Sequence, residues 1–110
     1  MADEPITPQQ MQSVVQDLQS TRSQVQAIAS QINEISLTMN ALSSQDEKRP
    51  VFRAVGNLLL EVDDRKALAD ELGESKTAFE SHLELLVERE SDLSSQYDEM
   101  IESFENQCGQ

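Results

Sequence analysis

Basic and aromatic residues are scarce in this chain of 110 residues. It has 8 Lys and Arg residues against 21 Asp and Glu residues, a net charge of −13, no tryptophan and an aromatic content of 4%. Nucleic-acid binding needs clustered Lys and Arg residues, and an anionic membrane repels an acidic surface. The charge balance therefore argues against both kinds of partner. It leaves proteins with basic or exposed apolar surfaces as candidates.

Cysteines and long apolar runs are also nearly absent. The single cysteine, Cys108, excludes a disulfide within the chain, which is typical of proteins from a reducing compartment. No apolar run approaches the length of a membrane-spanning helix, and the acidic N-terminus has no features of a secretion signal. We therefore expect a cytoplasmic protein, with the nucleus as an alternative location.

The sequence does contain a long heptad pattern. Ten positions, spaced alternately by 3 and 4 residues, carry nine apolar side chains. This spacing keeps one apolar stripe on one side of an α-helix, which must pack against another helix. The ten residues are Met11, Val14, Leu18, Thr21, Val25, Ile28, Ile32, Ile35, Met39 and Leu42.

The expected first helix has clear ends. Thr7 can cap its N-terminus, with Pro8 at the first helical position and Gln10 completing a capping box. Pro50 disfavours helix in the residue before it. The sequence therefore predicts a helix over about residues 7–43.

A β-hairpin is expected next, over residues 50–62. Two β-prone runs flank Gly56-Asn57, a dipeptide able to take the positive φ of a two-residue turn. Such a hairpin alone is marginally stable in water and leaves both edges open. We therefore expect several copies or related chains to pool their hairpins into a closed β-barrel. The residues assigned to this assembly are Val51, Phe52, Val55, Gly56, Asn57, Leu58, Leu59, Leu60 and Val62.

A second helix is expected over residues 64–105, and the chain ends beyond the two helices are expected to fray. The heptad pattern of this second helix is less regular than that of the first helix. Suppose that the two helices pair antiparallel and that the centre of the pairing lies beside the hairpin turn. The polar Thr21 then lies opposite Glu90, and Met39 lies opposite Leu72. Its a and d positions are Ala69, Leu72, Lys76, Phe79, Leu83, Leu86, Glu90, Leu93, Tyr97, Met100 and Phe104.

Together these features predict a mainly α fold with one domain over residues 1–110. It is an antiparallel two-helix coiled coil joined by one β-hairpin, and the hairpin joins an oligomeric β-barrel. At 1.5 Å per residue the coiled-coil arm is roughly 55–60 Å long. A dimeric coiled coil between chains is the alternative, although a proline-flanked hairpin argues against one continuous rod.

The central segment also resembles a known family. Residues 33–61 include Asn33-Glu34-Ile35-Ser36-Leu37, Asp46-Glu47-Lys48-Arg49 and the run Phe52-Arg53-Ala54-Val55-Gly56-Asn57-Leu58-Leu59-Leu60-Glu61. These are similar to the NE-x-S-L, D-E-x-R and aromatic-R-x-V-G-x-x-L-x-E patterns of the β-class prefoldins, most of all the eukaryotic subunit 2 group. Phe52 and Asn57 stand where that group more often has Tyr and Gly.

This resemblance implies a function without catalysis. A prefoldin is a hexamer of two α-class and four β-class subunits, joined through β-barrels, with six coiled-coil arms. It holds unfolded proteins, notably actin and tubulin chains, and passes them to the group II cytosolic chaperonin without using nucleotide. The implied partners are therefore other prefoldin subunits, unfolded clients and that chaperonin. No cofactor, metal or catalytic residue is implied.

The helix ends farthest from the hairpin supply candidate client-binding residues. Val15 and Ile101 lie off the a/d seam, so helix pairing does not obviously cover them. A mobile apolar end rich in Met can adapt to many exposed hydrophobic segments, and several weak contacts together can hold a client. For the candidates that lie on the a/d seam, the alternative is that they only pack between the two helices and bind no client. The candidates are Ile6, Met11, Val14, Val15, Met100, Ile101 and Phe104, with Tyr97 beside them.

Two other function classes stay open. A non-chaperone scaffold subunit of a prefoldin-like assembly would cover the apolar ends with a fixed partner, whereas a chaperone needs them accessible. An enzyme would need a polar cluster in a concave site, and the lone His82 is better explained as a surface helix residue. The acidic second helix is best explained by solubility, with a basic surface on a partner as the alternative.

Overall fold

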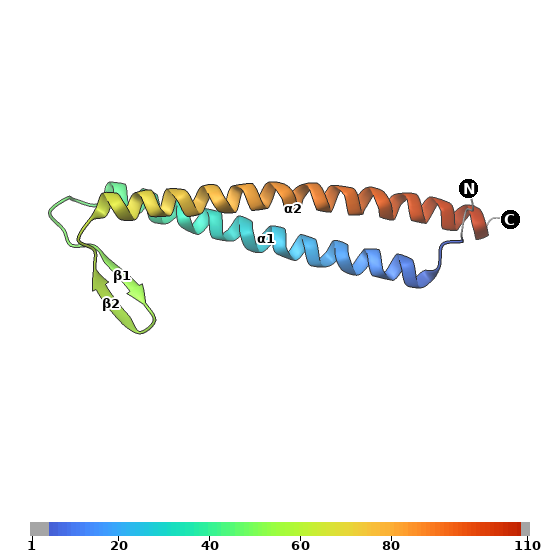
Figure 1. Ribbon diagram of the computed structural model, residues 1–110, viewed down its shortest axis with the longest axis horizontal. Helices are drawn as coiled ribbons and strands as arrows, with labels where there is room; N and C mark the ends of the chain where they lie inside the picture. The colour runs from blue at the N-terminus through green and yellow to red at the C-terminus, as the bar shows by residue number, and fades with distance from the viewer. Residues whose placement is uncertain (1–4, 109–110) are drawn as a thin grey trace. The chain divides into compact units, whose positions relative to one another are not determined.

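The computed structural model describes residues 5–108. In chain order its elements are α1 (Pro8–Ser44), β1 (Phe52–Val55), β2 (Leu58–Glu61) and α2 (Arg65–Cys108) (Figure 1). The predicted order of helix, hairpin and helix is confirmed. Within the described range, neither helix is both long and apolar enough to cross a membrane.

The described residues fall into two compact units. The first unit holds residues 5–27 and 83–108, and the second unit is Ile28–His82. Each unit contains one segment of α1 and one segment of α2. The hairpin belongs to the second unit.

The predicted capping box begins α1. The Thr7 backbone N–H donates to Oε1 of Gln10 at 2.9 Å, and the Gln10 backbone N–H donates to Oγ1 of Thr7 at 3.2 Å. These reciprocal bonds satisfy two N–H groups that have no partner within the helix. With Pro8 as the first helical residue, the N-terminus of α1 is as predicted.

Asp64 caps α2, because its Oδ1 accepts a hydrogen bond from the Ala67 backbone N–H at 3.0 Å. The other end of α2 differs from the prediction. The helix does not fray after Glu105 but continues to Cys108. In this last turn the side chain of Gln107 is hydrogen-bonded to Ile6 in the segment before α1, a contact that sequence periodicity does not reveal.

The heptad stripes form the packed seam in each unit. In the first unit, Val14, Leu18 and Thr21 of α1 and Leu86 and Met100 of α2 are buried, with 3–8% of their surface exposed. Every other predicted a or d position is half-buried in its own unit. The core is therefore one stripe of side chains per helix, as the heptads predicted.

Two contacts fix how the helices are paired. In the first unit, Nε of Arg22, the neighbour of Thr21, lies 3.3 Å from Oε1 of Glu90. In the second unit, a Cβ built on Gly73 would lie 3.9 Å from Cε of Met39. In both contacts the α2 residue lies one position from the partner that the predicted pairing gives to the α1 residue. A pairing shifted by one heptad would move that partner by seven positions. The predicted pairing is confirmed.

Strands β1 and β2 pair antiparallel, with Phe52 opposite Glu61 and Val55 opposite Leu58. Among the described residues, only Gly56 has a positive φ, of 60°. Asn57 therefore does not adopt a positive φ, although an asparagine can do so. A type II′ turn needs positive φ at its first central residue alone, so Gly56 is sufficient.

The two glycines predict opposite outcomes on replacement by alanine. Gly73→Ala should raise the free energy of unfolding by about 0.4–1 kcal/mol, because the new methyl makes an ordinary contact and the unfolded chain loses freedom. Gly56→Ala should lower it by about 1 kcal/mol or more, since the φ of +60° disfavours any Cβ although the space is open. Urea unfolding at one protein concentration measures both. Destabilisation by Gly73→Ala would show that the helices cannot accept a methyl group there.

Candidate interaction sites

The hairpin is the largest exposed apolar feature of the second unit. All residues of β1 and β2 are exposed, including Phe52 at 55% and Leu59 at 73%. Because opposite residues share a face, Phe52 and Leu59 lie on one face, and Val55, Leu58 and Leu60 lie on the other. Each strand pairs only with the other, so the described sheet has two open edges. A hairpin with two apolar faces and two open edges is a surface suited to strand pairing with another chain.

The base of the hairpin is closed by backbone and side-chain hydrogen bonds. The half-buried Val51 and Val62 continue the strand pairing, with the Val62 N–H donating to the Val51 carbonyl at 2.7 Å. Nη2 of Arg65 donates to the carbonyl oxygens of Asp46 and Arg49, each at 3.1 Å. The first residue of α2 thus holds the loop that leads into β1.

Sequence reasoning missed the role of Arg65. The available signal is its place in the first turn of α2, directly after the Asp64 cap. A cation in the first turn interacts unfavourably with the helix dipole, so an arginine at this position indicates a specific hydrogen-bond partner nearby. Carbonyl oxygens of the preceding loop are that partner.

Arg53 connects the hairpin to α2. Its Nη1 lies 3.5 Å from Oε2 of Glu71, and about half of each side chain is exposed. An exposed ion pair of this kind contributes about 1 kcal/mol or less. The pair therefore adds little to the stability of the fold.

The candidate client-binding residues all lie in the first unit. There the N-terminal part of α1 and the C-terminal part of α2 run side by side (Figure 1). Val14 and Met100 are buried, each 8% exposed, so the two close the seam. The half-buried candidates are Ile6, Met11, Val15, Ile101 and Phe104, and Tyr97 is half-buried as well. Client binding by this set stays a prediction.

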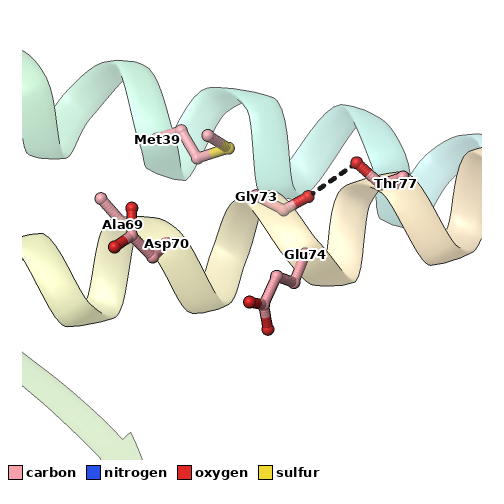
Figure 2. Close-up of a pocket in the computed structure, with 6 residues that line it drawn as sticks. All are labelled: Met39, Ala69, Asp70, Gly73, Glu74 and Thr77. Atoms are coloured by element: carbon pink, nitrogen blue, oxygen red, sulfur yellow. Dashed lines mark hydrogen bonds between the residues drawn. The ribbon is translucent and has the colours of Figure 1, made fainter.

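A shallow groove beside Met39 is lined by α2 residues of the second unit. Figure 2 shows Ala69 and Gly73 of α2 across from Met39 of α1, while the carboxylate of Glu74 points away from α1. The small residues Ala69 and Gly73 open this space. The hydroxyl of Thr77 donates a hydrogen bond to the Gly73 carbonyl at 3.0 Å, so this hydroxyl proton already has an acceptor. The lining contains no pairing of a nucleophile with a base. In the part of the chain that the structure describes, no group of three or more His, Cys, Asp or Glu residues is placed to hold a metal ion.

Comparison with known proteins agrees with this architecture. The family model described as "Prefoldin subunit" matches residues 8–110. The chain is 35% identical over 63 residues to prefoldin subunit beta of Thermoplasma volcanium, which covers 57% of this chain and 51% of that protein. It is 30% identical over 73 residues to prefoldin subunit beta of Thermoplasma acidophilum, covering 66% and 59%. The matches thus span about half to three fifths of the length of these relatives.

The fold of a solved structure is similar too. The crystal structure of the prefoldin beta2 subunit from Thermococcus strain KS-1 matches with a TM-score of 0.71 and 19% identity, covering 81% of this chain and 94% of that one. Two long helices joined by a two-stranded hairpin are therefore the fold of a prefoldin β subunit. This chain belongs to the prefoldin family, as its central segment indicated. Its similarity to the eukaryotic subunit 2 group stays a prediction.

Proposed function

We propose that this chain is one β-type subunit of a cytoplasmic prefoldin hexamer, an ATP-independent chaperone. The observation that carries the proposal is the hairpin, which is apolar on both faces and exposed throughout, in a chain of the prefoldin family. Burial of apolar area contributes roughly 25 cal/mol per Å². Pairing the hairpin with those of other prefoldin subunits removes that area from water and satisfies both edges.

The arm then serves as one of several weak binding sites. Unfolded proteins such as actin and tubulin chains bind through apolar segments to Val15, Ile101 and their neighbours in the first unit. Several arms acting on one client raise the effective concentration, so no single contact needs to be strong. The client is passed to the group II chaperonin. The cycle requires no nucleotide, cofactor or catalytic residue.

The experiment that tests this function is the double substitution Val15→Ser and Ile101→Ser. We expect the protein concentration needed to suppress aggregation of a denatured reporter by half to rise several-fold, because two half-buried apolar groups off the seam are lost. The native mass of the assembly should not change, since neither residue lies in the hairpin. Unchanged suppression, or loss of assembly, would refute the assignment.

A scaffold subunit of a prefoldin-like assembly is the second candidate. The burial of Val14 and Met100 favours it, because a seam that is closed offers less apolar surface to clients. A scaffold would show no suppression of aggregation even in the unsubstituted protein. It would also be recovered with a fixed partner that covers the half-buried residues of the first unit.

A further inference from the structure

The last turn of α2 holds the segment that precedes α1. The Ile6 backbone N–H donates to Oε1 of Gln107 at 2.9 Å, and Nε2 of Gln107 donates to the Ile6 carbonyl oxygen at 3.5 Å. One carboxamide thus binds both backbone polar groups of one residue. In Figure 1 this segment runs across from the start of α1 to the end of α2. The contact joins residues 101 positions apart in the sequence.

Ile6 lies in the segment that connects the start of α1 to the last turn of α2. It directly precedes the Thr7 cap, and Met11 follows four positions after that cap, so the two occupy the positions of a hydrophobic staple. Ile6, Met11 and Phe104, which lies about one turn before Gln107, are all half-buried. Ile6 is continuous with the cap of α1 and hydrogen-bonded to the last turn of α2. It therefore spans the two helix ends.

We propose that the Gln107 carboxamide and the Ile6 backbone form a latch over the apolar end of the first unit, and that unfolded segments bind there when the latch is open. This inference rests on the client binding proposed above. Opening the latch frees Ile6 and makes the neighbouring half-buried side chains of Met11 and Phe104 more accessible. Closing the latch leaves these groups half-buried, which limits their contact with water when no client is present.

The hydrogen bonds have the right strength for a reversible latch. An intramolecular hydrogen bond of this kind shifts an equilibrium by roughly two- to tenfold, because water competes for both partners. A client that binds only the open form shifts the population toward that form. The latch therefore lowers client affinity by a modest factor and does not prevent binding.

The test compares Gln107→Ala with Asn106→Ala in the assembly formed with partner prefoldin subunits. Asn106 is its exposed neighbour on α2, and among the described residues its side chain makes no hydrogen bond. We expect Gln107→Ala to speed hydrogen exchange at the Ile6 amide by roughly two- to tenfold. It should also lower the concentration needed to suppress aggregation of urea-denatured citrate synthase. Asn106→Ala should match the unsubstituted protein in both measurements.

Gln107→Glu keeps one of the two hydrogen bonds of the latch and removes the other. A glutamate carboxylate can still accept from the Ile6 N–H, but it cannot donate to the Ile6 carbonyl. Exchange at the Ile6 amide should therefore stay about as slow as in the unsubstituted protein, because a carboxylate accepts at least as strongly as an amide oxygen. Exchange at Ile6 that is the same in all variants would overturn the latch.

Comparing Gln107→Ala with the separate double variant Val15→Ser and Ile101→Ser distinguishes failure of the latch from failure of the function on which it rests. Suppose that Gln107→Ala leaves client suppression unchanged while the serine pair lowers it. The first unit then binds clients without a latch, and the inference is wrong. If neither change affects the suppression of client aggregation in an intact assembly, the first unit does not bind clients. The latch then cannot regulate client binding, and both proposals are wrong.

Discussion

Phe52→Asp should abolish assembly of this chain while leaving both helices folded. Phe52 is 55% exposed on β1, so the helices lose no packing when it is replaced. In a shared sheet the same position is covered by a neighbouring chain. Placing an unpaired carboxylate there costs several kcal/mol, which is enough to shift assembly by a factor of a hundred or more. Native mass spectrometry reads the stoichiometry, and far-UV circular dichroism reads the helix content.

One side effect of this substitution needs a control. Phe52 lies opposite Glu61, so an aspartate there also places two negative charges face to face and weakens the hairpin itself. Phe52→Lys removes that repulsion, since a lysine attracts Glu61, yet it still puts a charge into the shared sheet. We expect it to block assembly as well. Ser81→Asp adds a negative charge at an exposed position of α2, outside the hairpin, and should assemble normally.

The shared-sheet model would be ruled out by normal oligomers from both Phe52 variants. Assembly would then depend on another surface, and the exposed hairpin would need a different occupant. Loss of assembly in Ser81→Asp would show instead that any added negative charge suffices. The three variants together separate these explanations.

Leu86→Ala should destabilise the arm far more than Leu85→Ala. Leu86 is 7% exposed in the seam of the first unit, whereas its neighbour Leu85 is 64% exposed. Removing a buried leucine side chain costs about 2–5 kcal/mol, and the lower part of that range applies because a thin seam relaxes easily. Leu85→Ala should change the free energy of unfolding by about 0.5 kcal/mol or less.

This comparison is measured by urea unfolding of both variants at one protein concentration, since assembly makes stability concentration-dependent. The two substitutions delete the same atoms from adjacent residues of one helix, so helix propensity cancels. Equal destabilisation by both would mean that Leu85 is also covered, for instance by another subunit in the assembly. A negligible effect of Leu86→Ala would contradict the seam.

The sequence predicts most of this fold because the fold is made from repeats and caps. The heptads determine which side of each helix is buried, and the match of Thr21 with Glu90, together with a centre beside the turn, favours one pairing among those seven residues apart. Both follow from side-chain periodicity alone. The capping box at Thr7 likewise depends on residues only three positions apart.

The missed features depend on contacts that have no period. Arg65 binds carbonyl oxygens of Asp46 and Arg49, and every residue offers a carbonyl, so no sequence pattern marks these acceptors. The bond between Gln107 and Ile6 has the same character, and it coincides with helix where fraying was expected. The turn differs for another reason: Gly56 alone supplies the positive φ, which leaves the tolerance of Asn57 unused. Client binding cannot be predicted with the same security, because a half-buried side chain such as Ile101 suits both packing and binding.

The thin seam also determines how the arm responds to temperature. Among the described residues, no side chain is less than 2% exposed, so unfolding uncovers less apolar surface per residue than it does in a globular domain. The heat-capacity increment of unfolding scales with that newly hydrated apolar area. A small increment flattens the curve of stability against temperature. The arm should therefore keep nearly the same modest stability through cooling and mild heating.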